Sequence, residues 1–401
     1  MSAVTSTHIC HIVSTYKDDV LNQQLLSNIS CSMSKDYEHT LVVLSSQPSQ
    51  RFSLPDGVSC IELKNKKPLC LRSFRECKKV LSLLKPDVCH TYGEAPLAMQ
   101  WLAHRSGVPV KLHQLSSSQA LPCQNWIKKT FLSVLSHSTD VFITASANAQ
   151  HWLESNLGLS PEQCQIIRPA INAQRYRPAL QEVDPHRTNS FLGTVAIPTN
   201  KFVVGTNIND QHLDSVINLI DEFAVASKLS PAFKKHAMLL IAGNARFLPL
   251  LRKEIQVRNL GEDVCILGEL PNYWLFYKVI DALISPTEID TTTALHLEAM
   301  AMAVPIISLR SRKLEKRSEH PLFWTDKNGH CRIQHQLLEI FTDMNKRLRL
   351  GREARLYVQE KHCVKEYELR LKALYQLARP PANTSYASTP HLYASTSSKR
   401  E

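Results

Sequence analysis

The residues best placed to do chemistry are three carboxylates gathered within eleven positions of the chain: Glu288, Asp290 and Glu298. Between them lie three consecutive threonines whose hydroxyls can cap a helix, and these are Thr291, Thr292 and Thr293. A helix that starts there presents unpaired backbone N–H groups and a partial positive charge at its first turn. The segment therefore predicts an anion-binding helix start with carboxylates beside it.

The elements that position these carboxylates can be identified from the surrounding pattern. Ala282–Ile284 is a short apolar run that predicts a buried strand, and we expect Ser285 and Pro286 to end it because proline has no ladder donor. The helix is predicted to continue to Val304, and a new strand begins at Ile306 after Pro305. Strand, acidic loop, helix and strand in this order are typical of a parallel sheet whose crevice binds a ligand.

The spacing of Asp290 and Glu298, with the intact phrase Glu-Ala-Met-Ala at Glu298–Ala301, resembles the donor-site signature of family 4 glycosyltransferases. Similar phrases follow in the family's order at Lys85–Thr91, Arg168–Pro178, Glu262–Gly268 and Arg347–Arg355. The resemblance covers about residues 8–378. Within the family, the sequence is most similar to sugar transferases associated with exopolysaccharide systems. It implies the GT-B fold, an α/β architecture of two Rossmann-like domains that face a cleft, with a C-terminal helix crossing back.

Alternating strand and helix patterns divide the chain in agreement with that fold. We predict an N-terminal Rossmann-like acceptor domain at 1–185 and a C-terminal nucleotide-sugar donor domain at 200–362. A crossing helix is predicted at 363–378. The segment 379–401 is rich in Ser, Thr and Pro, a composition that predicts a disordered tail.

The resemblance also implies roles for particular residues. Glu298 would hold the ribose hydroxyls, although a carboxylate near a helix start also stabilises that helix without any ligand. Asp290 takes the position that contacts the donor sugar, and Glu288 replaces it if the loop is shifted in register. His113 stands near the family's catalytic histidine, two or three positions early, and a histidine at a strand end is the alternative interpretation.

Other positions depart from the family pattern. Where the family carries an Arg and a Lys that clamp the diphosphate, this chain has Asn209 and Asp214. Losing one preorganised donor of this kind typically lowers the rate by about 10²–10³. Arg312 and Lys313, in a basic segment after the last strand, would restore the charge, or they belong to an ordinary exposed loop.

Composition limits the partners. The net charge of +11 favours an anionic partner. Lys64–Lys85 combines a helical apolar face with many cations, which indicates an ordinary solvated helix face or contact with anionic lipid headgroups; no signature of a nucleic-acid module accompanies it. Scattered cysteines, no secretory signal and no long apolar run favour a cytoplasmic protein, peripheral at the inner membrane face if that surface binds lipid.

Taken with these features, the resemblance implies a retaining, metal-independent glycosyltransferase of the hexosyltransferase type, with no cofactor. It would move a sugar from a nucleotide-diphosphate sugar to a glycan or lipid-linked acceptor in surface-polysaccharide biosynthesis. The altered diphosphate clamp keeps a second hypothesis open. On that reading the chain is a catalytically inactive GT-B scaffold or regulatory partner in a glycan-assembly complex.

Overall fold

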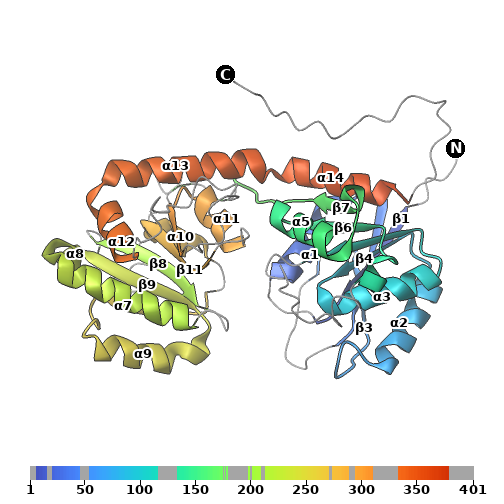
Figure 1. Ribbon diagram of the computed structural model, residues 1–401, viewed down its shortest axis with the longest axis horizontal. Coiled ribbons are helices and arrows are strands. Elements are labelled where there is room, and N and C mark those ends of the chain that lie inside the picture. Colours follow the sequence, from blue (N-terminus) through green and yellow to red (C-terminus); the bar gives the residue numbers. More distant parts are fainter. Residues whose placement is uncertain are drawn as a thin grey trace, which may run out of the picture.

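The computed structural model describes residues 6–15, 20–45, 54–115, 133–174, 176, 178, 197–198, 201–208, 213–270, 273–288, 294–309 and 333–378. Two lobes, each built on a parallel sheet, lie side by side, and two C-terminal helices run along both of them (Figure 1). These helices are α13 (Met344–Lys361) and α14 (Val364–Gln376). Within the described ranges, no helix combines the length and the apolar character that crossing a bilayer requires.

The first sheet has seven parallel strands in the order β3-β2-β1-β4-β5-β6-β7. Helices α2 and α3 pack on one face, while α1 and α14 pack on the other. The strands are β1 (Thr7–Val13), β2 (Tyr37–Val43), β3 (Ser59–Glu62), β4 (Val88–Tyr92), β5 (Val110–Gln114), β6 (Val141–Thr144) and β7 (Cys164–Ile166). The helices are α1 (Val20–Ser32), α2 (Leu71–Leu84), α3 (Glu94–Arg105), α5 (Ala147–Leu157) and the short η1 (Pro161–Gln163).

The second sheet has five parallel strands in the order β10-β9-β8-β11-β12. They are β8 (Phe202–Ile208), β9 (Ala237–Gly243), β10 (Val264–Gly268), β11 (Ala282–Glu288) and β12 (Ile306–Leu309). The helices are α7 (Leu213–Leu229), α8 (Pro231–His236), η2 (Ala245–Phe247), α9 (Leu248–Val257), α10 (Trp274–Val279), α11 (Ala294–Ala301) and α12 (Ile333–Thr342). The predicted two-domain α/β architecture with parallel sheets is confirmed.

The same local device starts a strand in both sheets. An aspartate just before a strand accepts a hydrogen bond from the backbone N–H of the second residue of the neighbouring strand. Asp87 accepts from His8 at 2.8 Å, Asp140 from Lys111 at 2.7 Å, and Asp281 from the backbone N–H of residue 203 at 2.8 Å. The carboxylate satisfies a backbone donor at the strand start, which fixes the relative start of the two strands.

Helix α14 belongs to the first domain by packing, although it follows the whole second domain in the chain. Tyr367, Leu371 and Tyr375 are buried against strands β1, β4 and β5. The predicted crossing back of the last helix is therefore confirmed. Along the chain, residues 167–201 separate the last strand of the first sheet from the first strand of the second. The predicted tail 379–401 lies outside the described residues.

Polar side chains fill part of the core between α14 and the first sheet. His11 is hydrogen-bonded to the hydroxyl of Tyr92 at 3.0 Å and to His39 at 3.0 Å. His90 is hydrogen-bonded to the hydroxyl of Tyr375 at 3.0 Å. Burial lowers the pKa of His39 to about 4 and of His90 to about 3, and it lowers the pKa of His11 well below its ordinary value. The rings are therefore neutral at physiological pH.

Asn28 links this network to the crossing helix. Its Nδ2 donates to Tyr92 at 2.9 Å and to Gln114 at 3.0 Å, and its Oδ1 accepts a hydrogen bond from the hydroxyl of Tyr367. The amide thus connects helix α1, strands β4 and β5, and helix α14. These hydrogen bonds matter for stability because all the groups are buried, and a buried polar group without a partner costs free energy of folding.

The core of the second domain is apolar by comparison. Phe233 packs against Phe223 with ring centroids 5.2 Å apart and against Phe341 at 5.3 Å, while Phe202 lies 5.5 Å from Phe341. These rings come from α8, α7, α12 and β8, so they join three helices to the sheet. Edge-on and tilted ring contacts of this kind add to the burial of apolar area.

The structure corrects several details of the sequence prediction. Strand β11 continues to Glu288, because its register against β12 shifts between Ser285 and Glu288 and this irregularity accommodates Pro286. The helical pattern over 334–360 predicts one continuous stretch, but the structure has two helices there, since Asp343 caps α13 by accepting from the backbone N–H of Lys346 at 2.8 Å. The prediction omitted β7 and α8. The helical spacing of Leu71 with the other apolar residues of 64–85 predicts that it packs, but it is 86% exposed at the start of α2.

Candidate active site

The second sheet has a topological switch point between β8 and β11. From β8 the chain turns to β9 and β10 on one side, whereas from β11 it goes to β12 on the other. Ligands of open α/β sheets bind outside the carboxyl ends of the strands at such a point. The segments that follow these two strands, 209–212 and 289–293, lie outside the described residues. Four predicted site residues fall in them, Asn209, Asp290, Thr291 and Thr292, and their roles stay predictions.

Glu288 is the last residue of β11, and its backbone pairs in register with Leu309 of β12. It therefore lies at the carboxyl end of the sheet, where the topology puts a ligand site. Its side chain is outside the described part of the chain, as are Arg312 and Lys313 in the segment 310–332. The proposed exchange of roles between Glu288 and Asp290 stays open.

Glu298 is half-buried on α11, the helix that follows the switch-point strand. Its Oε1 accepts a hydrogen bond of 2.7 Å from the hydroxyl of Tyr176, in the segment between the domains. Tyr277 supplies a second phenol beside this carboxylate. Burial, and after it the Glu298 carboxylate, raises the pKa of Tyr277 well above its usual value. The carboxylate is thus oriented by a tyrosine before any ligand binds.

Arg355 fixes the interdomain segment that carries this tyrosine. Its Nη1 donates to the backbone oxygen of Tyr176 at 2.8 Å and also to that of Ala301, the last residue of α11. Its Nη2 donates to the backbone oxygen of Ala173 at 3.4 Å. The guanidinium therefore ties α13, α11 and the interdomain segment together, and it holds Tyr176 against Glu298.

Further polar side chains surround the same helix start. His296, buried on α11, is hydrogen-bonded through Nε2 to the hydroxyl of Ser285 at 3.1 Å. The side-chain amide of Asn207, near the end of β8, donates to the hydroxyl of Tyr273. Sequence reasoning did not single out His296 or Tyr273. The position of His296 two residues before Glu298 was an available signal, and Tyr176 lies in the phrase Arg168–Pro178 that the resemblance had already marked.

Asp214 is exposed in the first turn of α7, where its charge is favourable for the helix dipole. The resemblance expects a diphosphate-binding lysine at this place. A carboxylate there repels a diphosphate that approaches the same helix start. Local helix stability therefore accounts for Asp214, whereas phosphate binding does not.

His113 lies on β5 in the first domain and has no exposed surface. Its Nδ1 is hydrogen-bonded to the hydroxyl of Thr91 at 2.7 Å, and Gln100 donates to the same hydroxyl at 2.7 Å. Burial lowers the pKa of His113 to about 3, so the imidazole is neutral at physiological pH. Its catalytic role stays a prediction, and any contact with a substrate would require the groups that cover it to move.

Comparisons with known proteins agree on the architecture. The family model described as Glycosyltransferase Family 4 matches residues 28–175, and the model described as Glycosyl transferases group 1 matches residues 210–357. The two matches fall on the first and the second sheet respectively. No curated protein sequence matches the chain.

Solved structures with the same fold span nearly the whole chain. Anabaena HepE in complex with UDP has a TM-score of 0.71 at 13% identity, covering 92% of this chain and 99% of that one. A glycosyltransferase from Rickettsia africae has a TM-score of 0.70 at 12% identity, covering 94% and 100%. WaaG, a glycosyltransferase involved in lipopolysaccharide biosynthesis, has a TM-score of 0.64 at 11% identity, covering 91% and 99%. At such low identity these likenesses show the fold alone.

Proposed function

Because the chain belongs to the family 4 glycosyltransferases of the GT-B fold, we propose that it moves a hexose from a nucleotide-diphosphate sugar to a glycan or lipid-linked acceptor. The proposed transfer retains the configuration of the anomeric carbon and uses no metal. The structure of Anabaena HepE contains UDP, which makes UDP the first nucleotide to test. The stated role of WaaG supports surface-polysaccharide biosynthesis as the setting.

One observation carries the proposal: Glu298 stands on the helix after the switch-point strand, with its carboxylate held by Tyr176 at 2.7 Å. A carboxylate is a paired acceptor, and the vicinal hydroxyls of a ribose are two adjacent donors. The oxygen that now accepts from Tyr176 would accept from a ribose hydroxyl once a nucleotide enters. We therefore assign nucleoside recognition to Glu298.

The departing diphosphate needs positive charge. In the proposed mechanism it lies at the start of α11, which follows the switch-point strand β11 and presents backbone N–H groups there. Arg312 and Lys313 are proposed to supply the side-chain cations that Asn209 and Asp214 do not. Asp290 is proposed to contact the donor sugar, and His113 the reacting end of the acceptor.

Two observations favour the second candidate, an inactive scaffold or regulatory partner in a glycan-assembly complex. Asp214 puts a negative charge at the start of α7, where a diphosphate clamp needs a positive one. In addition, the contact from Tyr176 gives Glu298 a structural role that requires no nucleotide. Both candidates share the fold and differ in whether a nucleotide binds.

Calorimetric titration with UDP and UDP-sugars separates them. If Glu298 binds the ribose, Glu298→Gln should weaken UDP binding by roughly tenfold or more, because a charge-assisted hydrogen bond is lost. Tyr176→Phe is the matched control: it removes the competing phenol hydroxyl and should leave UDP affinity unchanged or higher. Absence of UDP binding to the unmutated protein would favour the scaffold.

The proposed diphosphate cations have their own test. Reversing Arg312 and Lys313 to Glu should abolish UDP affinity but spare the weak binding of uridine, because only the phosphates interact with these cations. Uridine binding would still depend on Glu298. Equal loss of UDP and uridine binding would show that the double variant disturbs the site as a whole, and this would reject the proposed division of roles.

The basic surface of α2 supports a further part of the proposal, attachment to an anionic membrane face in the cytoplasm. Leu71 and Leu83 are 86% and 81% exposed on this helix. Arg75, Lys78 and Lys79 are exposed too, and at about 100° per residue they fall on the same side of α2 as the two leucines. Apolar side chains interleaved with cations suit a lipid surface better than they suit water alone.

Vesicle sedimentation tests this surface. Lys78→Glu with Lys79→Glu should weaken binding to vesicles that contain anionic lipid, and the difference should shrink at high salt. Lys234→Glu with Lys235→Glu on α8 reverses two exposed charges in the other domain and serves as the control. If the α8 variant weakens vesicle binding as much as the α2 variant, general charge rather than α2 is responsible.

A further inference from the structure

Helix α9 of the second domain has an exposed face that combines apolar and cationic side chains. Its Leu251 and Ile255 are buried in the core. At about 100° per residue, Leu250, Lys253 and Val257 fall on the side of the helix that is turned away from these two residues. Val257 is 69% exposed and Leu250 is 38% exposed, and the exposed Lys253 lies between them along the helix. This face therefore offers apolar contact and positive charge together.

The two cations of α9 are available to an anionic partner. Arg252 and Lys253 are exposed, and neither forms an ion pair with another residue of the described chain. The neighbouring carboxylate, that of Glu254, is bound by Arg258 at 2.5 Å, and Arg258 also binds Asp221. Glu254 is thus neutralised within the protein, whereas the charges of Arg252 and Lys253 are balanced only by ions of the solvent.

The position of α9 relates this face to the basic surface of α2. Figure 1 shows α9 and α2, which belong to different domains, along the same edge of the molecule, the lower edge in that view. Helices α13 and α14 run along the opposite edge. Helix α2 has the same combination of side chains as α9, since its exposed Leu71 and Leu83 lie on the same side as Arg75, Lys78 and Lys79. A flat anionic surface against the lower edge would therefore meet both helices.

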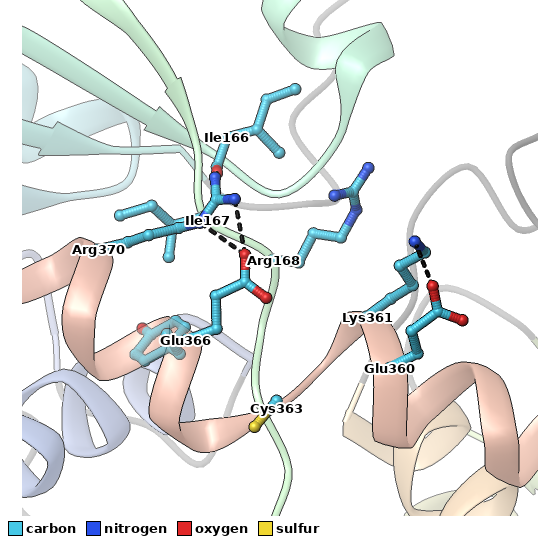
Figure 2. A pocket seen from close by; sticks show the side chains of 9 residues that line it. Ile166, Ile167, Arg168, Glu360, Lys361, Cys363, Glu366 and Arg370 are labelled. Carbon is cyan, nitrogen blue, oxygen red and sulfur yellow. Dashed lines mark hydrogen bonds and ion pairs between the residues drawn. The ribbon is translucent and has the colours of Figure 1, made fainter. Parts of the chain in front are cut away.

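Several cations on the opposite edge are paired with carboxylates instead. Lys361 of α13 lies 2.7 Å from Glu360, and Arg370 of α14 lies 2.7 Å from Glu366 (Figure 2). Apolar exposure does not distinguish the two edges, because Leu356 of α13 is 64% exposed. The difference is in charge, and it favours an anionic lipid surface on the edge that α2 and α9 form.

We propose that α9 is a second membrane contact, which binds the same anionic lipid surface as α2 and so attaches both domains to it. This contact rests on the attachment proposed for α2 and extends it to the second domain. Leu250 and Val257 enter the headgroup region, while Arg252 and Lys253 interact with the lipid phosphates. Once one helix has bound, the other is held close to the surface, so the two weak contacts reinforce each other.

Sedimentation with vesicles of phosphatidylcholine and phosphatidylglycerol in equal parts tests the contact. Arg252→Glu with Lys253→Glu should weaken vesicle binding by roughly tenfold or more, because two charges that attract the lipid are replaced by two that repel it. This difference should shrink at high salt. Val257→Ser should weaken binding severalfold at low and at high salt alike, since its contribution is apolar.

The matched control is Lys234→Glu with Lys235→Glu on α8, which makes the same change of charge in the same domain. It should leave vesicle binding within about twofold of that of the unmutated protein. Thermal unfolding of each variant establishes that it is folded. Equal losses in the α8 and α9 variants, or no loss in the α9 variant, would overturn the contact.

Fluorescence quenching locates α9 directly. Val257→Trp and Leu356→Trp each add an indole at an exposed position, the first on α9 and the second on the opposite edge. With vesicles that contain brominated lipid, Val257→Trp should show more quenching than the unmutated protein, because bromine quenches only nearby indoles. Leu356→Trp should show no such increase. Equal quenching in the two variants would overturn the placement of α9 on the membrane.

The α9 contact fails or stands separately from the other proposals. These measurements use no nucleotide, so their outcome does not depend on whether UDP binds. Loss of vesicle binding in the Lys78→Glu, Lys79→Glu variant alone would support α2 and overturn the contact through α9. Loss in the Arg252→Glu, Lys253→Glu variant alone would support α9 and overturn the attachment through α2.

Discussion

The two domains share a plan but fill their cores differently. In the first, neutral histidines and tyrosine hydroxyls form hydrogen bonds between the sheet and α14. In the second, four phenylalanine rings join α7, α8 and α12 to the sheet. Both sheets are parallel and covered on both faces, so topology does not require the difference.

The comparison shows that α14, which follows the whole second domain in the chain, packs on the first domain through polar groups. Directional hydrogen bonds fix a position, whereas apolar contacts tolerate sliding. A helix that must find one place on a distant domain gains specificity from Tyr367 and Tyr375. The price is sensitivity to protonation, which the apolar core avoids.

Acid should therefore destabilise the first domain more than the second, and this is the largest effect that we expect. The folded-state pKa values of His11, His39, His90 and His113 lie below the ordinary 6.5. Their contribution to stability is complete above about pH 6.5 and is lost progressively as the pH falls below it. Hydrogen exchange followed by mass spectrometry from about pH 7.5 to about pH 5 should show loss of protection in the first sheet first. Equal loss in both sheets would contradict the comparison.

Phe233→Ala should destabilise the second domain by about 3–5 kcal/mol, because it leaves a cavity among three other rings. Urea unfolding should give the same loss at about pH 7.5 and at about pH 6, since no titrating group is involved. Leu229→Ala, at a side chain that is 56% exposed at the end of α7, is the control and should change stability little. A pH-dependent loss would mean that the ring cluster is coupled to the histidine network.

Tyr367→Phe should destabilise the first domain by about 1–3 kcal/mol, because the buried Oδ1 of Asn28 loses its donor. Leu369→Ala lies two residues away on α14 at a side chain that is 72% exposed, and it should be nearly neutral. Protection of the first sheet from hydrogen exchange reports the loss. If Tyr367→Phe proves neutral as well, α14 docks by apolar contact and the two domains are alike after all.

The smallest effect concerns what the domains have in common. Asp87→Asn and Asp281→Asn each weaken one hydrogen bond at a strand start, and each should lower stability by about 0.5–1 kcal/mol. Similar values from urea unfolding would identify the device as shared between the two sheets. A much larger loss at Asp281 would instead point to its ion pair with Arg347, 3.6 Å away.

Most strands were predictable because apolar runs between turn residues mark buried parallel strands. The shift in register that admits Pro286 was not, since it depends on the partner strand β12. The close packing at Gly351 was marked by a family phrase, and its cause is visible only in three dimensions: an added Cβ would lie 2.1 Å from the backbone oxygen of Ala303.

The candidate site likewise has features that the sequence predicts and contacts that it does not. Glu298 was predictable from its spacing, whereas its partner Tyr176 is 122 residues away and from another part of the fold. The burial of His113 also depends on neighbouring strands and on α3, which a local pattern does not reveal. Spacing identifies a residue type at a place in a sheet, but its contacts arise from distant segments.

The docking of α14 has a consequence for how the protein is made. The ribosome synthesises residues 7–166 long before it adds Tyr367, Leu371 and Tyr375, which complete the core of that first domain. Until then the face of the sheet around His11 and His90 lacks its cover, while the second domain can already close its own core. The part synthesised first is therefore the last to mature, and for that interval it is the part that most needs a chaperone.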